Sequence, residues 1–170
     1  RYQPTAFMAW IEIVKDFEKK GFFNNFTDIR ERLEAALIEY KYFTNQVTLK
    51  YGSGLKGYLQ LKDVYDKMIE LVLGEVDVSD IGGQLKNNFS YLNVEHRGGH
   101  PQSKEFNENT KSEVFLNSAL QSANKCRICN GYIHVKSISI DHVDRKEDGG
   151  IGVADNGQIS HPYCNTTYKN

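Results

Sequence analysis

The sequence lacks long apolar runs, a strong charge of either sign and a visible signal peptide. No stretch approaches the roughly 20 apolar residues that a membrane-spanning helix needs, so we expect no membrane partner. The formal net charge is −1, and residues 124–170 carry 6 basic and 5 acidic side chains. This balance provides no global basic field for nucleic acid. A protein of this composition can still act on nucleic acid if its site holds a cation.

Cysteine is scarce as well. The three cysteines are Cys126, Cys129 and Cys164, and an odd number does not suit a disulfide framework. All three lie within the last 45 residues. Clustered cysteines outside a disulfide context are typical of metal binding in a reducing compartment, so we expect a cytoplasmic protein.

The first 90 residues carry apolar side chains at helical spacing, in three segments: 4–20, 27–51 and 55–73. Gly21 and Gly74 are suited to helix ends, and Thr27 is suited to the N-cap of the second helix. Long helices that are joined by short turns favour an antiparallel bundle with the apolar stripes in its core. We therefore predict a helical bundle over residues 1–90.

Residues 91–123 differ from this pattern. The stretch "LNVEHRGGHPQSKEFNENT" is polar and contains two glycines and a proline, which predicts a long loop. The stretch "KSEVFLNSALQSA" follows and predicts a shorter amphipathic helix. We interpret this region as a loop and a connecting helix.

Two short motifs near the C-terminus contain ligands for a soft metal. "CRIC" supplies Cys126 and Cys129, "HPYC" supplies His161 and Cys164, and 31 residues separate the two pairs. Three cysteines and one histidine form a common structural zinc site, a closed tetrahedron with no open position for water. A free turn or a redox pair is the alternative, but a redox CxxC accompanies a βαβ pattern that is not seen here. The tail has few core residues, so a metal would supply part of its folding free energy.

Between these motifs, "SISI" alternates polar and β-branched residues and predicts a strand that delivers Asp141 and His142 at its end. Because neighbouring strand residues point to opposite faces, the two can approach one atom only at a bend or at the strand edge. "KEDGGIGVADNGQ" predicts a glycine-rich loop, and "QIS" predicts a second strand. "HPYCNTTYK" predicts a final helix with Pro162 in its first turn.

This order of motifs resembles the HNH endonucleases, in the zinc-stapled form of the ββα-metal fold, over residues 124–170. The matching elements are "CRIC", "DHVDRKEDGG", "DN" at 155–156 and "HPYCN". The resemblance implies an α+β chain in which an N-terminal α-helical bundle is followed by a small ββα-metal nuclease domain with structural Zn²⁺. The domain boundaries that we expect are 1–90, 91–123 and 124–170.

The resemblance also implies roles for individual residues and a DNA substrate. His142 corresponds to the general base, and Asp141 and Asn165 correspond to ligands of a catalytic Mg²⁺ or Mn²⁺ ion. Asn156 corresponds to the middle Asn that braces the loop, although a simple turn residue beside Gly157 is an equal alternative. The nearest basic residues are our candidates for contacts with the nucleic-acid backbone: Lys136, Arg145, Lys146 and Lys169.

The sequence departs from the family pattern in four places. His161 replaces the usual first cysteine of the second pair, and Asn165 stands where many members have histidine. No proline follows Asp141–His142, and Lys169 comes four residues after Asn165 rather than three. These differences preserve the expected chemistry and leave the substrate contacts open.

A non-catalytic zinc-binding module that binds nucleic acid or a protein is the alternative. Both interpretations require zinc, but only the nuclease requires Asp141, His142 and Asn165 to meet at one ion. The N-terminal stretches "QPTAFMAW" and "KYGSGLKGY" are similar to helical segments that accompany HNH tails in bacterial restriction and anti-phage proteins. Together with a first residue other than Met, this similarity implies a longer parent chain with an upstream regulatory domain.

Overall fold

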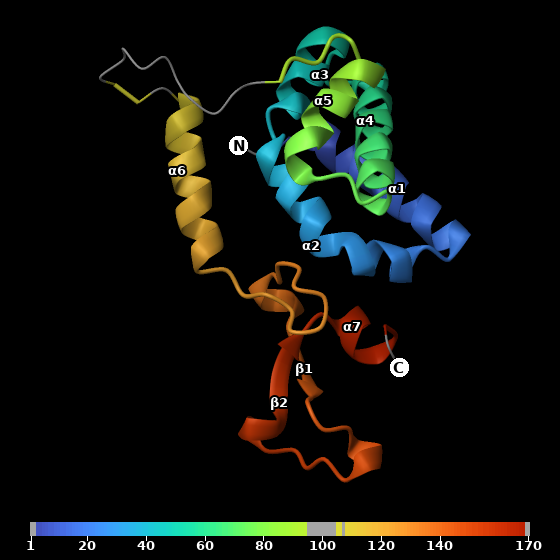
Figure 1. Cartoon of the computed structure of the whole chain (residues 1–170), viewed down its shortest axis with the longest axis vertical. Coiled ribbons are helices and arrows are strands. Elements are labelled where there is room, and N and C mark those ends of the chain that lie inside the picture. The colour runs from blue at the N-terminus through green and yellow to red at the C-terminus, as the bar shows by residue number, and fades with distance from the viewer. Residues whose placement is uncertain (1–2, 95–104, 107, 169–170) are drawn as a thin grey trace. The chain divides into compact units, whose positions relative to one another are not determined.

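The computed structural model describes residues 3–94, 105–106 and 108–168. The chain divides into two compact units, Arg1–Glu95 and His96–Asn170 (Figure 1). Most of the polar loop that was predicted after residue 91 lies outside the described residues. Within the described part of the chain, none of the helices combines the length and the apolar character that crossing a membrane requires.

The described residues of the N-terminal unit form five helices: α1 (Pro4–Lys20), α2 (Phe23–Glu39), α3 (Phe43–Tyr51), α4 (Leu55–Leu73) and α5 (Val78–Asn88). α4 packs against each of the other four and supplies the centre of the core (Figure 1). Its apolar stripe is buried as the spacing predicts, at Leu61, Val64, Met68, Ile69 and Val72 among others. Gly21 ends α1 in the left-handed conformation at φ 62°, which glycine adopts without strain. The predicted helical character of this region is confirmed. α1 and α4 have the bounds that were predicted for the first and the third helix.

The second predicted helix differs from the structure at both ends. α2 begins at Phe23, before Thr27, and the Thr27 hydroxyl donates to the Phe23 carbonyl inside the helix at 2.7 Å. The predicted N-cap at Thr27 is therefore wrong. The reason is aromatic packing. The ring centroids of Phe22 and Phe23 lie 5.0 and 6.2 Å from that of Phe17 in α1, and this contact favours a helix that begins at Phe23.

The same predicted helix is also interrupted after Glu39, and α3 begins at Phe43. Tyr40 lies at this break, where its buried ring packs against the α5 segment and its hydroxyl donates to the Val78 carbonyl at 2.7 Å. A methyl group built on Gly82 would overlap the Tyr40 ring, so the close approach of α5 requires glycine there. A tertiary contact thus sets the helix boundary that the local pattern did not show.

We expect Gly82→Ala to lower the free energy of unfolding of the N-terminal unit by about 1–3 kcal/mol, because the added methyl group displaces a buried ring. Gly83→Ala is the matched control, since Gly83 lies in the same helix and its added methyl group meets no atom within 4 Å. That change should be neutral or stabilise by up to about 1 kcal/mol through helix propensity. Urea unfolding of both variants measures the difference. Equal effects of the two changes would show that Tyr40 does not hold α5.

The described residues of the C-terminal unit form α6 (Glu108–Gln121), β1 (Ser139–His142), β2 (Gly157–Ser160) and α7 (Pro162–Thr166). β1 and β2 pair antiparallel, and α7 packs against β1. The predicted order of strand, loop, strand and helix is confirmed, and Pro162 occupies the first turn of α7 as predicted. β1 begins two residues later than predicted because 135–137 form a 3-10 turn, in which His134 Nδ1 accepts a hydrogen bond from the Lys136 N–H.

The hydrophobic core of the C-terminal unit is small. Among its described residues, the buried apolar ones are Cys126, Ile133, Cys164 and Tyr168, and four partly buried residues pack around them: Ile128, Cys129, Ile138 and Tyr163. A core of this size contributes little folding free energy compared with that of the helical unit. Cysteines 126 and 164 belong both to this core and to the predicted metal site.

Candidate metal centres and catalytic pocket

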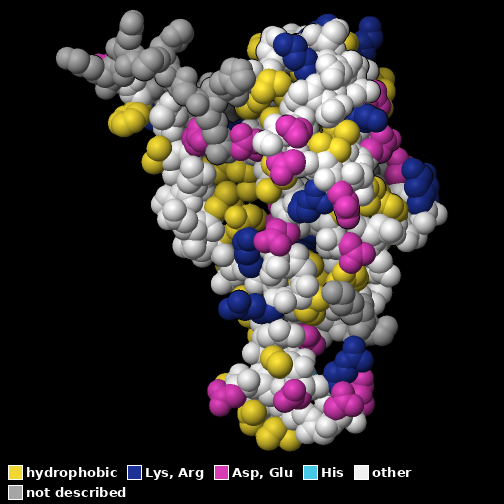
Figure 2. Space-filling view, in the orientation of Figure 1, with side chains coloured by type: hydrophobic (Ala, Val, Ile, Leu, Met, Phe, Trp, Pro, Cys, Tyr) yellow, Lys and Arg dark blue, Asp and Glu magenta, His cyan; other side chains and the backbone are white. Residues whose placement is uncertain are grey.

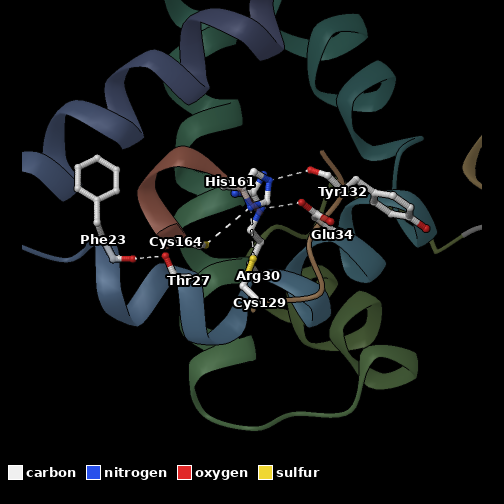
Figure 3. Close-up of polar contacts among 8 residues, drawn as sticks. All are labelled: Phe23, Thr27, Arg30, Glu34, Cys129, Tyr132, His161 and Cys164. Carbon is white, nitrogen blue, oxygen red and sulfur yellow. Dashed lines mark hydrogen bonds and ion pairs between the residues drawn. The ribbon is translucent and has the colours of Figure 1, made fainter. Parts of the chain in front are cut away.

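The four predicted zinc ligands come together in the structure. The ligand atoms of Cys126, Cys129, His161 and Cys164 all lie within 4.8 Å of one another. Nδ1 of His161 lies 3.5 Å from the Cys129 sulfur and 3.8 Å from the Cys164 sulfur (Figure 3). Its Nε2 lies 3.1 Å from the Tyr132 carbonyl, which can accept its proton (Figure 3). In a neutral ring this leaves the Nδ1 lone pair directed at the sulfurs, as metal coordination requires.

Local structure explains why these side chains converge. After Cys126 the chain turns back, so that the Cys126 carbonyl accepts from the Asn130 N–H and the Cys126 N–H donates to the Gly131 carbonyl, both at 2.9 Å. Asn130 permits this turn through a φ of 56°, a conformation that Asn tolerates better than most residues. At the other half-site, His161 precedes α7 and Cys164 follows three residues later, a spacing that places both on one side of a helical turn.

The protonation of the three thiols also fits a cation. Burial raises the pKa of Cys164, and the neighbouring Cys129 raises it further. Burial likewise raises the pKa of Cys129. Burial opposes ionisation of Cys126 too, but backbone hydrogen bonds at Cys129, His161 and Ile128 lower its pKa. The protein's own hydrogen bonds thus favour ionisation of Cys126, and a divalent cation would offset the cost of ionising Cys129 and Cys164.

A second group of predicted residues lines one open pocket beside α7. Asp141 and His142 line this pocket from β1, Asn165 lines it from α7, and Arg145 and Lys146 also contribute to its lining. Of the other basic candidates, Lys136 is exposed and does not line the pocket, and Lys169 lies outside the described residues. The structure therefore places three predicted catalytic residues and two predicted phosphate contacts around one hollow.

The pleat of the sheet separates Asp141 from His142, as the sequence indicated. Asp141 shares a face of β1 with Ser139, whereas His142 shares the opposite face with Ile140. His142 is the last residue of β1, and both it and Asp141 line the pocket at α7. Both residues also line a second, mainly apolar hollow that includes Asn156.

Hydrogen bonds orient both predicted cation ligands. Oδ2 of Asp141 accepts from Nε2 of Gln158 at 2.9 Å. Nδ2 of Asn165 donates to Oγ of Ser139 at 2.6 Å and to the Ile140 carbonyl at 3.1 Å. A cation ligand from Asn165 would therefore be its carbonyl oxygen. Sequence reasoning missed Gln158 and Ser139, since their partners follow only from the strand register and from the packing of α7.

Asn156 is buried and braces the loop between the strands. Its Oδ1 accepts from the Asp144 N–H at 2.7 Å, and its Nδ2 donates to the carbonyls of Asp144 and Ile151 at 3.1 and 3.0 Å. Its own carbonyl accepts from the Val143 N–H at 3.0 Å. These bonds fix the backbone directly after His142.

The loop that Asn156 braces carries charges of both signs. Arg145 and Glu147 lie 3.4 Å apart, and both side chains are mostly exposed. Asp144, Lys146 and Asp148 are their neighbours, and Figure 2 shows acidic and basic side chains together at this end of the C-terminal unit. An exposed pair of this kind contributes little to stability.

Comparison with known proteins agrees with this geometry. The family model of the HNH endonucleases matches residues 126–170, the region that holds both the ββα elements and the three-cysteine, one-histidine cluster. The C-terminal region is thus of the HNH type, which indicates a nuclease, as its motifs predicted. No curated protein and no solved structure matches the chain. The helical region lies outside the family match, so its similarity to restriction and anti-phage proteins stays a prediction.

We expect one Zn²⁺ per chain and loss of the C-terminal fold when the metal is removed, because the small core cannot supply the folding free energy by itself. The measurement is an amide NMR spectrum of the full chain before and after complete chelation, with metal content determined in parallel. Resonances of residues 126–168 should collapse to unfolded positions, whereas those of the helical unit serve as the internal control. Native resonances throughout the metal-free chain would contradict a structural metal.

We expect Gly150→Ala to disrupt the braced loop, because a methyl group there would overlap the Asp144 carbonyl that accepts from Asn156. The cost should be about 1–3 kcal/mol of local stability. Gly152→Ala is the matched control in the same loop, since its added methyl group meets no atom within 4 Å. Hydrogen exchange of the Asp144 amide, which donates to Asn156, reports the change. Equal protection of this amide in the two variants would rule out the brace.

Proposed function

We propose that the C-terminal unit is a metal-dependent HNH endonuclease that hydrolyses phosphodiester bonds in DNA. The observation that carries the proposal is the meeting of Asp141, His142 and Asn165 around one pocket. The residues beside it fit the same chemistry, because Arg145 and Lys146 can contact the phosphates on either side of the scissile bond.

Each residue has a role that follows from its placement. His142 is the general base that takes a proton from the attacking water, since a neutral imidazole nitrogen can accept it. Asp141 and Asn165 would hold Mg²⁺ or Mn²⁺ through one oxygen each, and the remaining positions would go to water and phosphate oxygens. When bound, the ion supplies positive charge to the phosphate and to the leaving oxygen. Asn156 positions His142 by fixing the backbone that follows it.

The two metal sites have separate functions in this proposal. Sulfur and imidazole ligands form a closed site for Zn²⁺ that stabilises the fold. The oxygen ligands of the pocket suit a hard cation that retains open positions. Cys164 and Asn165 are adjacent in α7. The position of the zinc site would therefore also determine the position of the Mg²⁺ or Mn²⁺ site.

One observation favours the non-catalytic alternative. Glu147 lines the same pocket and lies within ion-pair distance of Arg145, so it competes with a phosphate for that guanidinium. In a zinc-binding module that recognises a protein, such mixed charge would be part of the binding surface.

The finer parts of the prediction rest on the motifs. We propose that the protein acts in the cytoplasm within a bacterial restriction or antiviral defence system, in which the helical unit and an upstream domain of a longer chain control the nuclease. The support is the similarity of "QPTAFMAW" and "KYGSGLKGY" to segments of such proteins and the clustered cysteines.

The test is conversion of supercoiled plasmid by the zinc-loaded full chain in Mg²⁺ and then in Mn²⁺. We expect His142→Ala to lower the cutting rate by at least about 100-fold, since loss of a general base typically costs 10²–10⁴-fold. His134→Ala is the matched control, because His134 is exposed in the same unit and lines none of the pockets described. Zinc content and thermal unfolding of all three proteins show whether the fold is retained.

The other outcomes separate the two functions. Equal cutting by the parent and by His142→Ala would mean that His142 is not the base. Failure of the folded, zinc-loaded parent to cut DNA in either metal would favour the non-catalytic module.

A further inference from the structure

Gln158 stands directly opposite Asp141 in the sheet. The register pairs the two residues across β1 and β2, so their side chains emerge on the same face. Nε2 of Gln158 donates to Oδ2 of Asp141 at 2.9 Å, and both residues line the pocket that also contains Asn165. No motif of the HNH type led us to this glutamine, and the roles proposed above leave it without one.

This hydrogen bond distinguishes the two carboxylate oxygens of Asp141. Oδ2 is engaged by the amide, whereas Oδ1 accepts no hydrogen bond from the described residues. The side chain of Asn165 is held in the same manner, through its Nδ2 on Ser139 and on the Ile140 carbonyl. The hydrogen bond from Gln158 therefore leaves Oδ1 as the Asp141 oxygen that can be offered to a cation.

The number of oxygens that a carboxylate offers affects which cation it prefers. Mg²⁺ requires near-ideal octahedral geometry with short bonds, which suits ligands that bind through a single oxygen. Ca²⁺ is larger, takes six to eight oxygens and often binds a carboxylate through both. A carboxylate whose second oxygen is occupied by a hydrogen bond thus disfavours Ca²⁺ relative to Mg²⁺ or Mn²⁺.

We propose that Gln158 is a positioning residue that fixes the Asp141 carboxylate for coordination through one oxygen and so favours Mg²⁺ and Mn²⁺ over Ca²⁺. The inference rests on the proposed function, because it requires Asp141 to be a cation ligand. Gln158 acts through Asp141 and takes no part in proton transfer.

The experiment measures binding of Mn²⁺ to the zinc-loaded full chain by electron paramagnetic resonance, with Ca²⁺ as competitor and without DNA. We expect Gln158→Leu to weaken Mn²⁺ binding roughly 10-fold, at the lower end of the range typical for loss of such a partner. Ca²⁺ binding should weaken less, so the ratio of the two affinities shifts toward Ca²⁺. Gln121→Leu makes the same chemical change at an exposed position of α6 and should leave both affinities unchanged.

Two further variants make the result decisive. Asp141→Asn should weaken Mn²⁺ binding more than Gln158→Leu does, which assigns the measured site to this pocket. Gln158→Met, which keeps an unbranched side chain and lacks the donor, replaces the leucine variant if that protein loses its zinc.

Each result has a distinct meaning. Weaker Mn²⁺ binding with a shifted ratio supports the inference. Parent-like affinities in the Gln158 variants, beside a weakened Asp141→Asn, overturn the inference and leave the proposed catalytic site intact. Equal weakening of Mn²⁺ binding and Ca²⁺ binding overturns the inference that Asp141 coordinates the cation through one oxygen. A parent that binds no Mn²⁺, or an Asp141→Asn variant that binds it like the parent, overturns both the inference and the catalytic cation site.

Discussion

The convergence of Cys126, Cys129, His161 and Cys164 is the constraint on which the C-terminal unit depends. Two of these ligands precede the sheet and two follow it, so a metal bound by all four joins the ends of the segment that contains both strands. Among the described residues of the unit, four apolar side chains are buried in its core, and two of them are cysteines of the cluster. Hydrophobic burial and metal binding therefore act at the same point, and loss of the cluster removes both.

The same cluster bears on where Asn165 lies relative to Asp141. α7 spans only Pro162–Thr166, with the cluster's His161 directly before it, Cys164 within it and Asn165 next in the chain. Asn165 in turn donates to β1 at Ser139 and Ile140, beside Asp141. The three-cysteine, one-histidine cluster thus lies at the helix, the helix presents Asn165, and the strand presents Asp141. Positioning through supported side chains of this kind is what a site for an oxygen-seeking cation requires.

The features that the sequence could predict are those encoded locally. Gly21 ends α1, the apolar stripe of α4 is continuous, and the spacing within "CRIC" and "HPYC" is sufficient to predict one ligand cluster. The features that it could not predict depend on tertiary contacts. Tyr40 interrupts the second helix because its ring packs beside Gly82 on α5. The partnership of Gln158 with Asp141 depends on strand register, and a slip of one residue would place the two side chains on opposite faces.

The charges around the pocket bear on how the site would bind DNA. Arg145 and Lys146 share their loop with Asp144, Glu147 and Asp148, so the loop by itself offers a phosphate no net attraction. In the proposed nuclease, positive charge at the scissile phosphate would come chiefly from the divalent ion, which makes DNA binding at this site and cleavage depend on the same cation. Without the metal ion, such a site would bind the DNA backbone only weakly. In that case, selection of a target would require contacts outside this pocket.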